Sequence, residues 1–219
     1  EEIRKERIRK LETLKRGGID VYPASSARTH TVAEVTTKFA ARARGKKKIV
    51  IAGRVRAKRE HGGSAFVDCQ DGSGSMQLFF KEDILGGAFA LFLETADIGD
   101  FIEAEGRPFE TKRGEKTLEV SRWAMLAKSL LPLPEKWHGL QDVEERFRRR
   151  YLDLLMNDEV RMRFEARSRI IAGIRKWHEK HGFLEVETPL LHQIPGGTLA
   201  TPFLTHHNAL DIDLYLRVA

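Results

Sequence analysis

The stretch SAFVDCQDGSGSMQLFF, residues 64–80, places an aromatic ring and an amide on the same predicted surface. Two alternating runs flank a Gly, Ser and Asp turn, which is typical of a β-hairpin. Their apolar face carries Ala65, Val67, Cys69, Met76, Leu78 and Phe80. The opposite face carries two aromatics, Phe66 and Phe79, among Asp68, Gln70 and Gln77. An exposed ring can stack on an unpaired base, a contact worth about 1 to 3 kcal/mol, while the amide hydrogen-bonds the edge of that base.

Two further residues are expected beside this ring. Glu115 lies in the turn TKRGEK, residues 111–116, and Arg59 lies near the end of the run KIVIAGRVRAKRE, residues 48–60. A carboxylate can read a base edge, and a guanidinium can meet a phosphate or a base. The alternative is that Phe66 packs beneath the N-terminal helices as part of a small satellite core. Four suitable residues on one predicted face favour the binding interpretation.

The order of elements predicts the fold that positions these residues. Helices are expected over 1–18 and 31–44, the second with a capping box formed by Thr31 and Glu34. Strands follow over 48–60 and in the hairpin, then a helix from about Glu82 to Ala96, then strands over 100–110 and 117–123. Three strands, a helix and two strands are the order of an OB-fold barrel. Such barrels bind single-stranded nucleic acid on strands two and three, beneath the loop between strands four and five.

Composition restricts the class of protein. The 219 residues are 41% hydrophobic and 32% charged, enough for one large or two ordinary domains. Cys69 is the single cysteine, so neither a disulfide framework nor a cysteine-based zinc site is expected. No apolar run approaches the ~20 residues of a membrane span, and the charged first residues lack the apolar core of a secretion signal. We therefore expect a cytoplasmic protein without membrane attachment.

The net charge is concentrated in the first part of the chain. Residues 1–130 contain 25 Lys and Arg against 19 Asp and Glu, whereas residues 131–219 contain 13 of each kind. A basic domain joined to a neutral one suggests a polyanionic partner for the first. A basic surface that serves only solubility is the alternative, and charge alone does not separate the two.

A second unit is expected beyond the barrel. The segment LLPLPEKWHGLQD contains Pro132 and Pro134 and is typical of a linker. We expect domains over 1–130 and 151–219 with a linker over 131–150. A long helix over 158–181 carries an apolar stripe that needs a partner surface, and a strand FLEVETPLL ends at Pro189. The run Arg148 to Arg150 points three ways on a helix, so solvated or ion-paired side chains are favoured over a nucleic-acid patch.

The quoted segments resemble a known family. The barrel order, the linker region PLPEKWHGLQDVEERFRRRYLDL, the long helix leading into GFLEVETPLL, and PGGTLATPFLTHHNALDIDLYLRVA are together similar to bacterial-type lysyl-tRNA synthetase, a class II aminoacyl-tRNA synthetase. The resemblance covers nearly the whole chain. It implies an α+β protein: a five-stranded OB-fold barrel with N-terminal helices, then the beginning of the antiparallel-sheet catalytic domain of class II synthetases.

The resemblance also assigns roles to residues. Phe66 matches the aromatic that stacks on the central uridine of the anticodon, Gln77 and Glu115 match the residues that read it, and Arg59 lies nearby. A second group of residues matches the catalytic domain. Gly197 and Ala219 match the lysine pocket, and Pro189, Phe164 and Ile174 match the motif 1 dimer interface.

The chemistry that the resemblance implies is the ATP-dependent formation of lysyl-adenylate and transfer of lysine to lysine tRNA. The partners are then lysine, ATP with Mg²⁺, lysine tRNA and a second copy of the chain. The arginines of motifs 2 and 3 lie downstream in the family, so we expect no catalytic residue and no metal ligand here, and no activity from these residues alone. His206 and His207 are adjacent on a predicted strand and face opposite ways, which disfavours a metal site.

Two other functions stay open. The first is a tRNA-binding module that uses its barrel without any enzymatic activity, and absence of the motif 2 and motif 3 arginines from the downstream sequence would indicate it. The second is an aspartyl- or asparaginyl-tRNA synthetase, whose barrel reads the same central uridine. The segment PGGTLATPF argues against the second.

Overall fold

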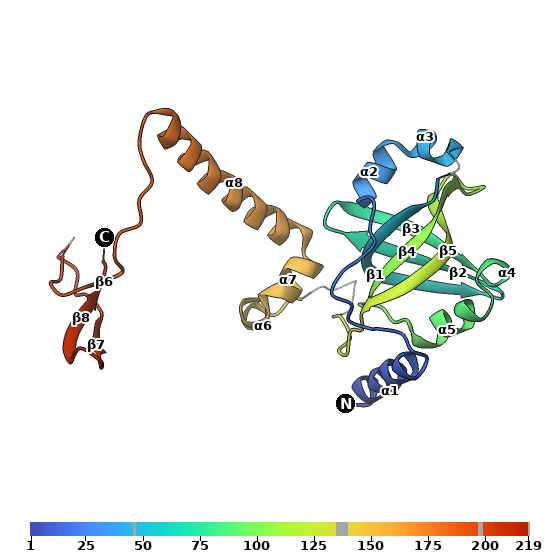
Figure 1. Cartoon of the computed structure of the whole chain (residues 1–219), viewed down its shortest axis with the longest axis horizontal. Coiled ribbons are helices and arrows are strands. Elements are labelled where there is room, and N and C mark those ends of the chain that lie inside the picture. The colour runs from blue at the N-terminus through green and yellow to red at the C-terminus, as the bar shows by residue number, and fades with distance from the viewer. Residues whose placement is uncertain (46, 135–139, 197–198, 219) are drawn as a thin grey trace. The chain divides into compact units, whose positions relative to one another are not determined.

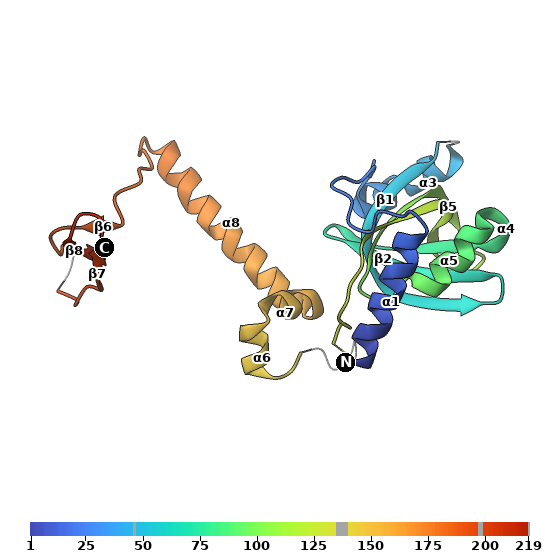
Figure 2. The same cartoon turned by 60° about the horizontal axis from the view of Figure 1, so that its bottom comes forward.

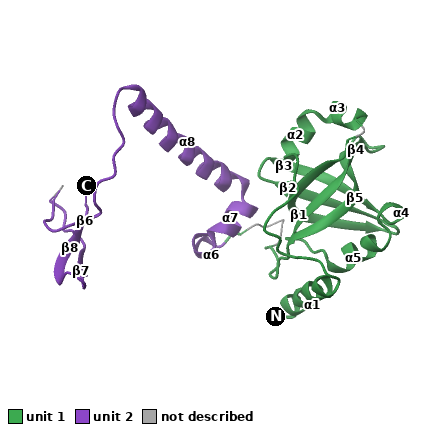
Figure 3. Cartoon of the chain, in the orientation of Figure 1, with its two compact units in different colours: residues 1–141 green, residues 142–219 purple. Residues whose placement is uncertain are grey.

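The computed structural model describes residues 1–45, 47–134, 140–196 and 199–218. These divide into two compact units, Glu1–Gln141 and Asp142–Ala219, which are described separately (Figure 3). The division falls within the range 131–150 that the sequence suggests for the linker.

Five strands of unit 1 form a closed barrel, as the sequence predicts (Figure 1). In chain order they are β1 (Ile49–His61), β2 (Ser64–Asp71), β3 (Gly74–Lys81), β4 (Phe101–Glu110) and β5 (Lys116–Ala127). The order around the barrel is β1-β2-β3-β5-β4, and the β3–β5 pair is parallel while the other pairs are antiparallel. The parallel pair closes the barrel, so no sheet edge is left between these strands.

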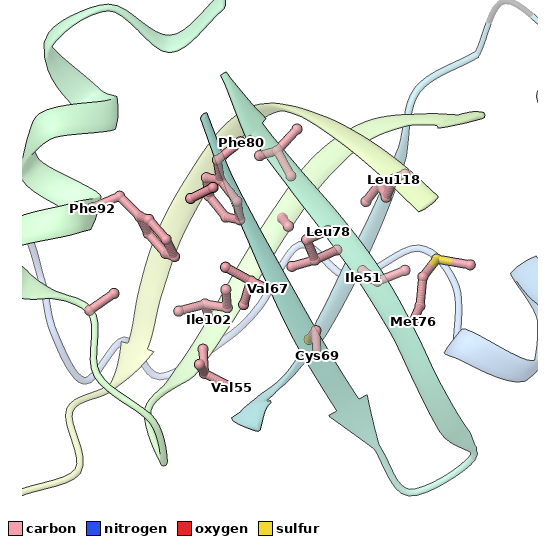
Figure 4. Packing of buried hydrophobic residues seen from close by; sticks show 14 of the residues in the cluster. Ile51, Val55, Val67, Cys69, Met76, Leu78, Phe80, Phe92, Ile102 and Leu118 are labelled. Carbon is pink, nitrogen blue, oxygen red and sulfur yellow. The ribbon is translucent and has the colours of Figure 1, made fainter. Parts of the chain in front are cut away.

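The alternating apolar residues of the hairpin face the inside of the barrel. Val67, Leu78 and Phe80 are fully buried, and Cys69 is 1% exposed (Figure 4). Burial raises the pKa of the Cys69 thiol to about 12, which keeps it protonated and inert. The ring of Phe80 stacks on that of Phe92 with centroids 3.9 Å apart. Phe92 lies on the helix between β3 and β4, so this helix caps one end of the core.

The helices of unit 1 are shorter and more numerous than the sequence suggests. They are α1 (Glu2–Arg16), α2 (Val32–Thr37), α3 (Phe39–Arg44), α4 (Glu82–Leu85) and α5 (Gly87–Thr95). The capping box of Thr31 and Glu34 begins α2 as predicted. The single helix expected over 31–44 breaks at Lys38, and the one expected over 82–96 breaks at Gly86, whose φ of 54° suits glycine and interrupts a helix.

A buried ion network attaches α1 to the barrel. Lys128 Nζ lies 2.6 Å from an Asp97 carboxylate oxygen and 2.7 Å from one of Asp100, and Lys10 lies 2.6 Å from Asp97. Beside it, Arg7 donates to the backbone carbonyls of Ser129, Leu131 and Ile98. Each buried charge therefore has a partner of opposite sign or a hydrogen-bonding carbonyl.

Unit 2 consists of three helices and a small sheet. They are α6 (Val143–Arg148), α7 (Arg150–Met156), α8 (Asp158–Lys180), β6 (Leu191–His192), β7 (Leu204–His207) and β8 (Ile212–Leu216), with antiparallel strand order β6-β8-β7. Fully buried Asp153 accepts hydrogen bonds from Arg146, Arg150 and Asn157. Arg148 and Arg149 pair with glutamates one turn earlier, so the ion-paired interpretation of the arginine run is confirmed.

One predicted strand of unit 2 is wrong. The structure has no strand over 183–189; regular pairing begins only at Leu191, opposite Leu216. A strand exists only where a neighbour accepts its backbone hydrogen bonds, and among the described residues none pairs with this segment.

The apolar stripe of α8, for which the sequence predicts a partner surface, is exposed to solvent in this structure. Phe164 is 40% and Ile174 55% exposed. In the described part of the chain, no helix combines the length and apolarity needed to cross a membrane.

Candidate nucleic-acid interface

An open pocket of about 600 Å³ lies on the outer surface of the barrel. Its walls come from the ends of β1 and β2, from β3 and from the turn between β4 and β5. The lining residues are Arg59, His61, Phe66, Gln77, Thr111, Lys112, Arg113 and Glu115. The structure therefore brings all four residues that the sequence singles out into one cavity.

Phe66 forms part of a row of rings on the outside of the barrel. It lies opposite Phe79 in the β2–β3 register, and the two rings stack with centroids 4.7 Å apart and an interplanar angle of 26°. Phe79 in turn lies 5.9 Å from Phe109, ring to ring. Phe66 is thus half-buried, because a ring on the neighbouring strand covers part of it. Its location in the pocket leaves ring surface for a ligand.

Gln77 is held by a residue that the sequence analysis missed. The hydroxyl oxygen of Thr117, on the parallel neighbour β5, lies 3.0 Å from Gln77 Oε1 and 3.1 Å from the Glu115 carbonyl oxygen. Thr117 is fully buried, so its position is fixed by packing. Its one proton can be donated to one of these oxygens at a time. When Thr117 donates to Gln77, the amide NH₂ of Gln77 is the group that faces away from it.

A β-bulge places Arg59 on the same face as Phe66. The β1–β2 register shifts between Val55 and Ala57, so Arg59 lies opposite Phe66 although simple counting by twos would turn it inward. The same shift turns Lys58 toward α5, where it donates to the Leu93 and Ala96 carbonyls, although alternation along residues 48–60 would place it on the outer face with Arg54 and Arg56. Bulges therefore re-aim side chains in ways that alternation alone does not predict.

The Arg59 guanidinium is oriented by Asp68. One nitrogen lies 3.0 Å and the other 3.5 Å from the two carboxylate oxygens, a fork-to-fork pair. Half of the Arg59 side chain is exposed, so its remaining N–H groups face solvent in the pocket. Asp68 also lies opposite Gln77 in the β2–β3 register. Asp68 on β2 therefore lies between the strand that carries Arg59 and the strand that carries Gln77.

Glu115 is presented by a tight turn. The backbone N–H of Thr111 donates to the Glu115 carbonyl, and the Thr111 hydroxyl accepts from the Glu115 N–H. Gly114 has φ of 81°, which glycine adopts without strain. The Glu115 side chain is exposed at the rim. Sequence reasoning located this turn, but it did not show that Thr111, Lys112 and Arg113 of the turn and His61 of β1 also line the pocket.

The predicted residues of unit 2 are placed as follows. Gly197 and Ala219 lie outside the described residues. Phe164, Ile174 and Pro189 are all exposed. His206 Nδ1 lies 2.9 Å from an Asp213 carboxylate oxygen in the opposite strand. Over the described ranges, no group of three or more His, Cys, Asp or Glu side chains is arranged to hold a metal ion.

Two family comparisons agree with this architecture. Residues 49–126 match the OB-fold nucleic acid binding domain, and residues 142–219 match the tRNA synthetases class II (D, K and N). Residues 142–219 are therefore similar to the class II tRNA synthetases, and the barrel is similar to OB-fold nucleic acid binding domains.

Within that family, its curated relatives are lysine–tRNA ligases, which confirms the resemblance found in the sequence. It is 50% identical to the lysine–tRNA ligase of Carboxydothermus hydrogenoformans over 100% of this chain and 44% of the relative. It is 48% identical to that of Moorella thermoacetica over 97% of this chain and 43% of the relative. With the enzyme of Xanthomonas campestris it shares 46% identity, over 98% of this chain and 44% of the relative. The chain thus spans less than half the length of these relatives.

Proposed function

We propose that the protein containing this chain ligates lysine to lysine tRNA, and that the barrel pocket reads the central base of the anticodon. The relatives named lysine–tRNA ligase support the reaction. The observation that carries the reading role is the single pocket shared by Arg59, Phe66, Gln77 and Glu115. An aromatic face, an amide, a carboxylate and a guanidinium are the groups needed to hold and identify one unpaired base.

In this proposal Phe66 supplies affinity. The central base stacks on the part of its ring that Phe79 leaves uncovered. Stacking of this kind is worth about 1 to 3 kcal/mol and differs little between bases, because every base has a π-face.

Gln77 and Glu115 supply discrimination. The edge of uridine presents a carbonyl oxygen on each side of an N–H group. A Gln77 amide whose oxygen accepts from Thr117 offers its NH₂ to a uridine carbonyl, while the Glu115 carboxylate accepts the uridine N–H. We assign the Gln77 contact to the O4 carbonyl. Cytidine has an amino group in place of O4 and an unprotonated ring nitrogen in place of the N–H, so both contacts become unfavourable. An unmade hydrogen bond in such a site costs about 1 to 3 kcal/mol.

Arg59 binds the strand on either side of that base. Asp68 fixes the plane of its guanidinium and leaves other N–H groups for a phosphate or a base edge. An arginine fixed in this way loses less conformational entropy on binding than a free one.

The ligation step is proposed for the whole protein and for no residue of the described ranges. ATP activates the lysine carboxylate as lysyl-adenylate with release of pyrophosphate, and Mg²⁺ neutralises phosphate charge in such steps. We assign no step of this chemistry to the described residues. Gly197 and Ala219 stay proposed members of the lysine pocket, and the cytoplasm stays the expected location.

A homodimer formed through α8 is also proposed. Phe164 and Ile174 expose apolar surface on this helix, and Pro189 follows it. Exposed apolar side chains along one helix are typical of an interface. Sedimentation of the protein as a single-copy species at micromolar concentration would contradict this part of the proposal.

The experiment that tests the function measures charging and base preference together. Lysine, aspartate and asparagine are compared as substrates, and anticodon stem-loops carrying each base at the central position are compared as ligands. Lysine charging with a preference for uridine of roughly five- to hundredfold is expected, which corresponds to about 1 to 3 kcal/mol. Charging of aspartate or asparagine would indicate the related synthetases, and absence of all charging would indicate a binding module.

A further inference from the structure

The segment 38–48, KFAARARGKKK, concentrates the positive charge of the chain. It contains six lysines and arginines and no acidic residue, which matches the formal net charge of +6 for all 219 residues. A run of cations is often only a solvated surface. Three observations on the described residues of this segment indicate a more specific role.

First, the segment adjoins the rim of the pocket. Phe39, the first residue of α3, is buried and lies beneath the ammonium of Lys116, 5.6 Å from nitrogen to ring centroid. Lys116 directly follows the pocket residue Glu115. Figures 1 and 2 show α3 at the end of the barrel where β4 turns into β5, whereas α1 lies at another end. The basic segment and the pocket are therefore neighbours.

Second, three exposed cations of the segment have no ionic partner among the described residues. Lys38, Arg44 and Lys47 are exposed, and none has a carboxylate oxygen within 4.0 Å in the described part of the chain. The same holds for Lys112 and Arg113 in the turn of the pocket. By contrast, the arginine run of unit 2 is paired residue by residue. Glu110 beside the turn and Glu115 within it supply two negative charges, fewer than the five positive charges of these cations.

Third, the other cations of the segment have structural partners. Arg42 donates to the Glu34 carbonyl and contacts His30 at 2.5 Å, and Lys48 pairs with Glu105 at 3.1 Å. The segment is thus anchored by two cations, while its remaining described cations face solvent. This separation of anchoring and unpartnered cations is what a surface for an external anion requires.

We propose that Lys38, Arg44, Lys47, Lys112 and Arg113, here called the basic strip, bind the sugar–phosphate backbone of the RNA stem whose loop enters the pocket. The proposal rests on the proposed function, because it takes the ligand of the pocket to be an anticodon loop. Phosphates favour exposed, unpaired lysines and arginines. The strip includes no apolar side chain, whereas a protein interface needs an apolar centre, so RNA fits it better than an acidic protein.

The test compares two triple variants of the whole protein. The first, Lys38→Gln with Arg44→Gln and Lys47→Gln, removes three cations of the strip. The control, Arg4→Gln with Lys5→Gln and Lys15→Gln, removes three exposed cations of α1 that have no carboxylate within 4.0 Å among the described residues. Affinity for the anticodon stem-loop is measured between about 50 and 200 mM salt.

Loss of three phosphate contacts should lower the slope of log affinity against log salt by roughly 2 to 3 units. Wild-type affinity should therefore fall roughly fifteen- to sixtyfold more than that of the strip variant over this salt range. The control should keep the wild-type slope. The strip variant should also keep the preference for uridine, and it should bind the isolated loop oligonucleotide as the wild type does.

Three outcomes would overturn the inference while leaving the proposed function intact. They are a strip variant with the wild-type slope, a control that loses as much slope as the strip variant, and an equal loss of affinity for the isolated loop. Uniform binding of all four central bases by the wild type would instead contradict the proposed function, and this inference with it. Melting temperatures of both triple variants should match the wild type, because all six side chains are exposed.

Discussion

The rings of Phe66 and Phe79 stack across neighbouring strands with their centroids 4.7 Å apart. In the proposed function, Phe66 is a base platform, and the Phe79 ring lies behind it. The Phe66 side chain is half-buried, so it is neither a core side chain nor a freely exposed one. The pair orients the Phe66 ring before any ligand arrives, which lowers the entropic cost of binding.

Replacement of Phe66 by alanine should weaken binding of the anticodon stem-loop by about 1 to 3 kcal/mol, with similar losses for all four central bases. The free energy of unfolding should fall by only about 0.5 to 1.5 kcal/mol, because one aromatic pair is lost. Phe66→Tyr keeps the ring and should keep the affinity. Titration of labelled RNA and urea unfolding measure the two quantities, and a loss of stability near 3 to 5 kcal/mol would show a core residue instead.

Replacement of Thr117 by valine should reduce discrimination between uridine and cytidine without removing the stacking platform. Valine has a similar shape and lacks the hydroxyl that lies 3.0 Å from Gln77 Oε1. We expect the preference for uridine to fall by about 1 to 3 kcal/mol. Gln77→Ala should act in the same direction.

Thr117→Ser is the matched control, since it retains the hydroxyl and should retain the preference. If Thr117→Val increased the preference for uridine, the Gln77 amide would have the opposite orientation, with its oxygen toward the base.

Replacement of Gly106 by alanine should destabilise the barrel by about 3 kcal/mol or more. An added Cβ would meet the Glu119 backbone, with its carbonyl carbon 2.8 Å away, and the backbone of a paired strand cannot move aside. Gly72→Ala, where nothing lies within 4 Å, should change stability by less than about 0.5 kcal/mol. Thermal unfolding compares the two variants, and equal midpoints would contradict the close approach of β4 to β5.

Mild acid should destabilise the protein partly through His30. Burial and the adjacent Arg42 guanidinium lower the pKa of the His30 imidazole below its ordinary 6.5. The unfolded chain then binds the proton more tightly, so stability is lost as pH falls from about 6.5 through the lowered pKa of the folded state. Wild type should lose more stability than His30→Gln between neutral pH and pH of about 5.

Urea unfolding at the two pH values measures the stability of wild type and of His30→Gln. If both lose the same free energy of unfolding, this effect of His30 is contradicted. The carboxyl of Asp97 does not interfere. Its burial raises its pKa, but hydrogen bonds from Lys10 and Lys128 outweigh burial and hold the pKa below its ordinary 3.8, outside the measured range.

Replacement of Lys128 by methionine should cost about 3 to 5 kcal/mol of stability, because the fully buried Asp100 carboxylate would lose its cation. Lys5→Met on α1, an exposed lysine without an ion pair in the described ranges, should stay within about 0.5 kcal/mol of wild type. Denaturant unfolding measures both. A neutral Lys128→Met would show that the pair contributes little net stability.

Alternation predicted the barrel strands and their buried face well, because a side-chain period of two is a local property. It placed Val67 and Leu78 inside and Phe66 and Gln77 outside, as observed. It failed at Lys58, where the bulge after Val55 reverses the faces.

Properties that depend on long-range neighbours were not readable from the sequence. Thr117 reaches Gln77 only because β3 and β5 pair in parallel across the closure of the barrel, 40 residues apart in the chain. Asp68 orients Arg59 only because of the shifted register. The family resemblance named the four residues of the barrel pocket. It gave no indication of the side chains, Thr117 and Asp68, that orient Gln77 and Arg59.

The attachment of α1 has a consequence for synthesis on the ribosome. Arg7 donates to carbonyls that follow it by 91 to 124 residues. The chain is made from the N-terminus, so α1 emerges long before Ile98, Ser129 and Leu131 exist. The complete set of Arg7 hydrogen bonds therefore forms only after the last barrel strand has left the exit tunnel. Among the elements of unit 1, α1 is thus translated first, yet its attachment is among the last contacts to be completed.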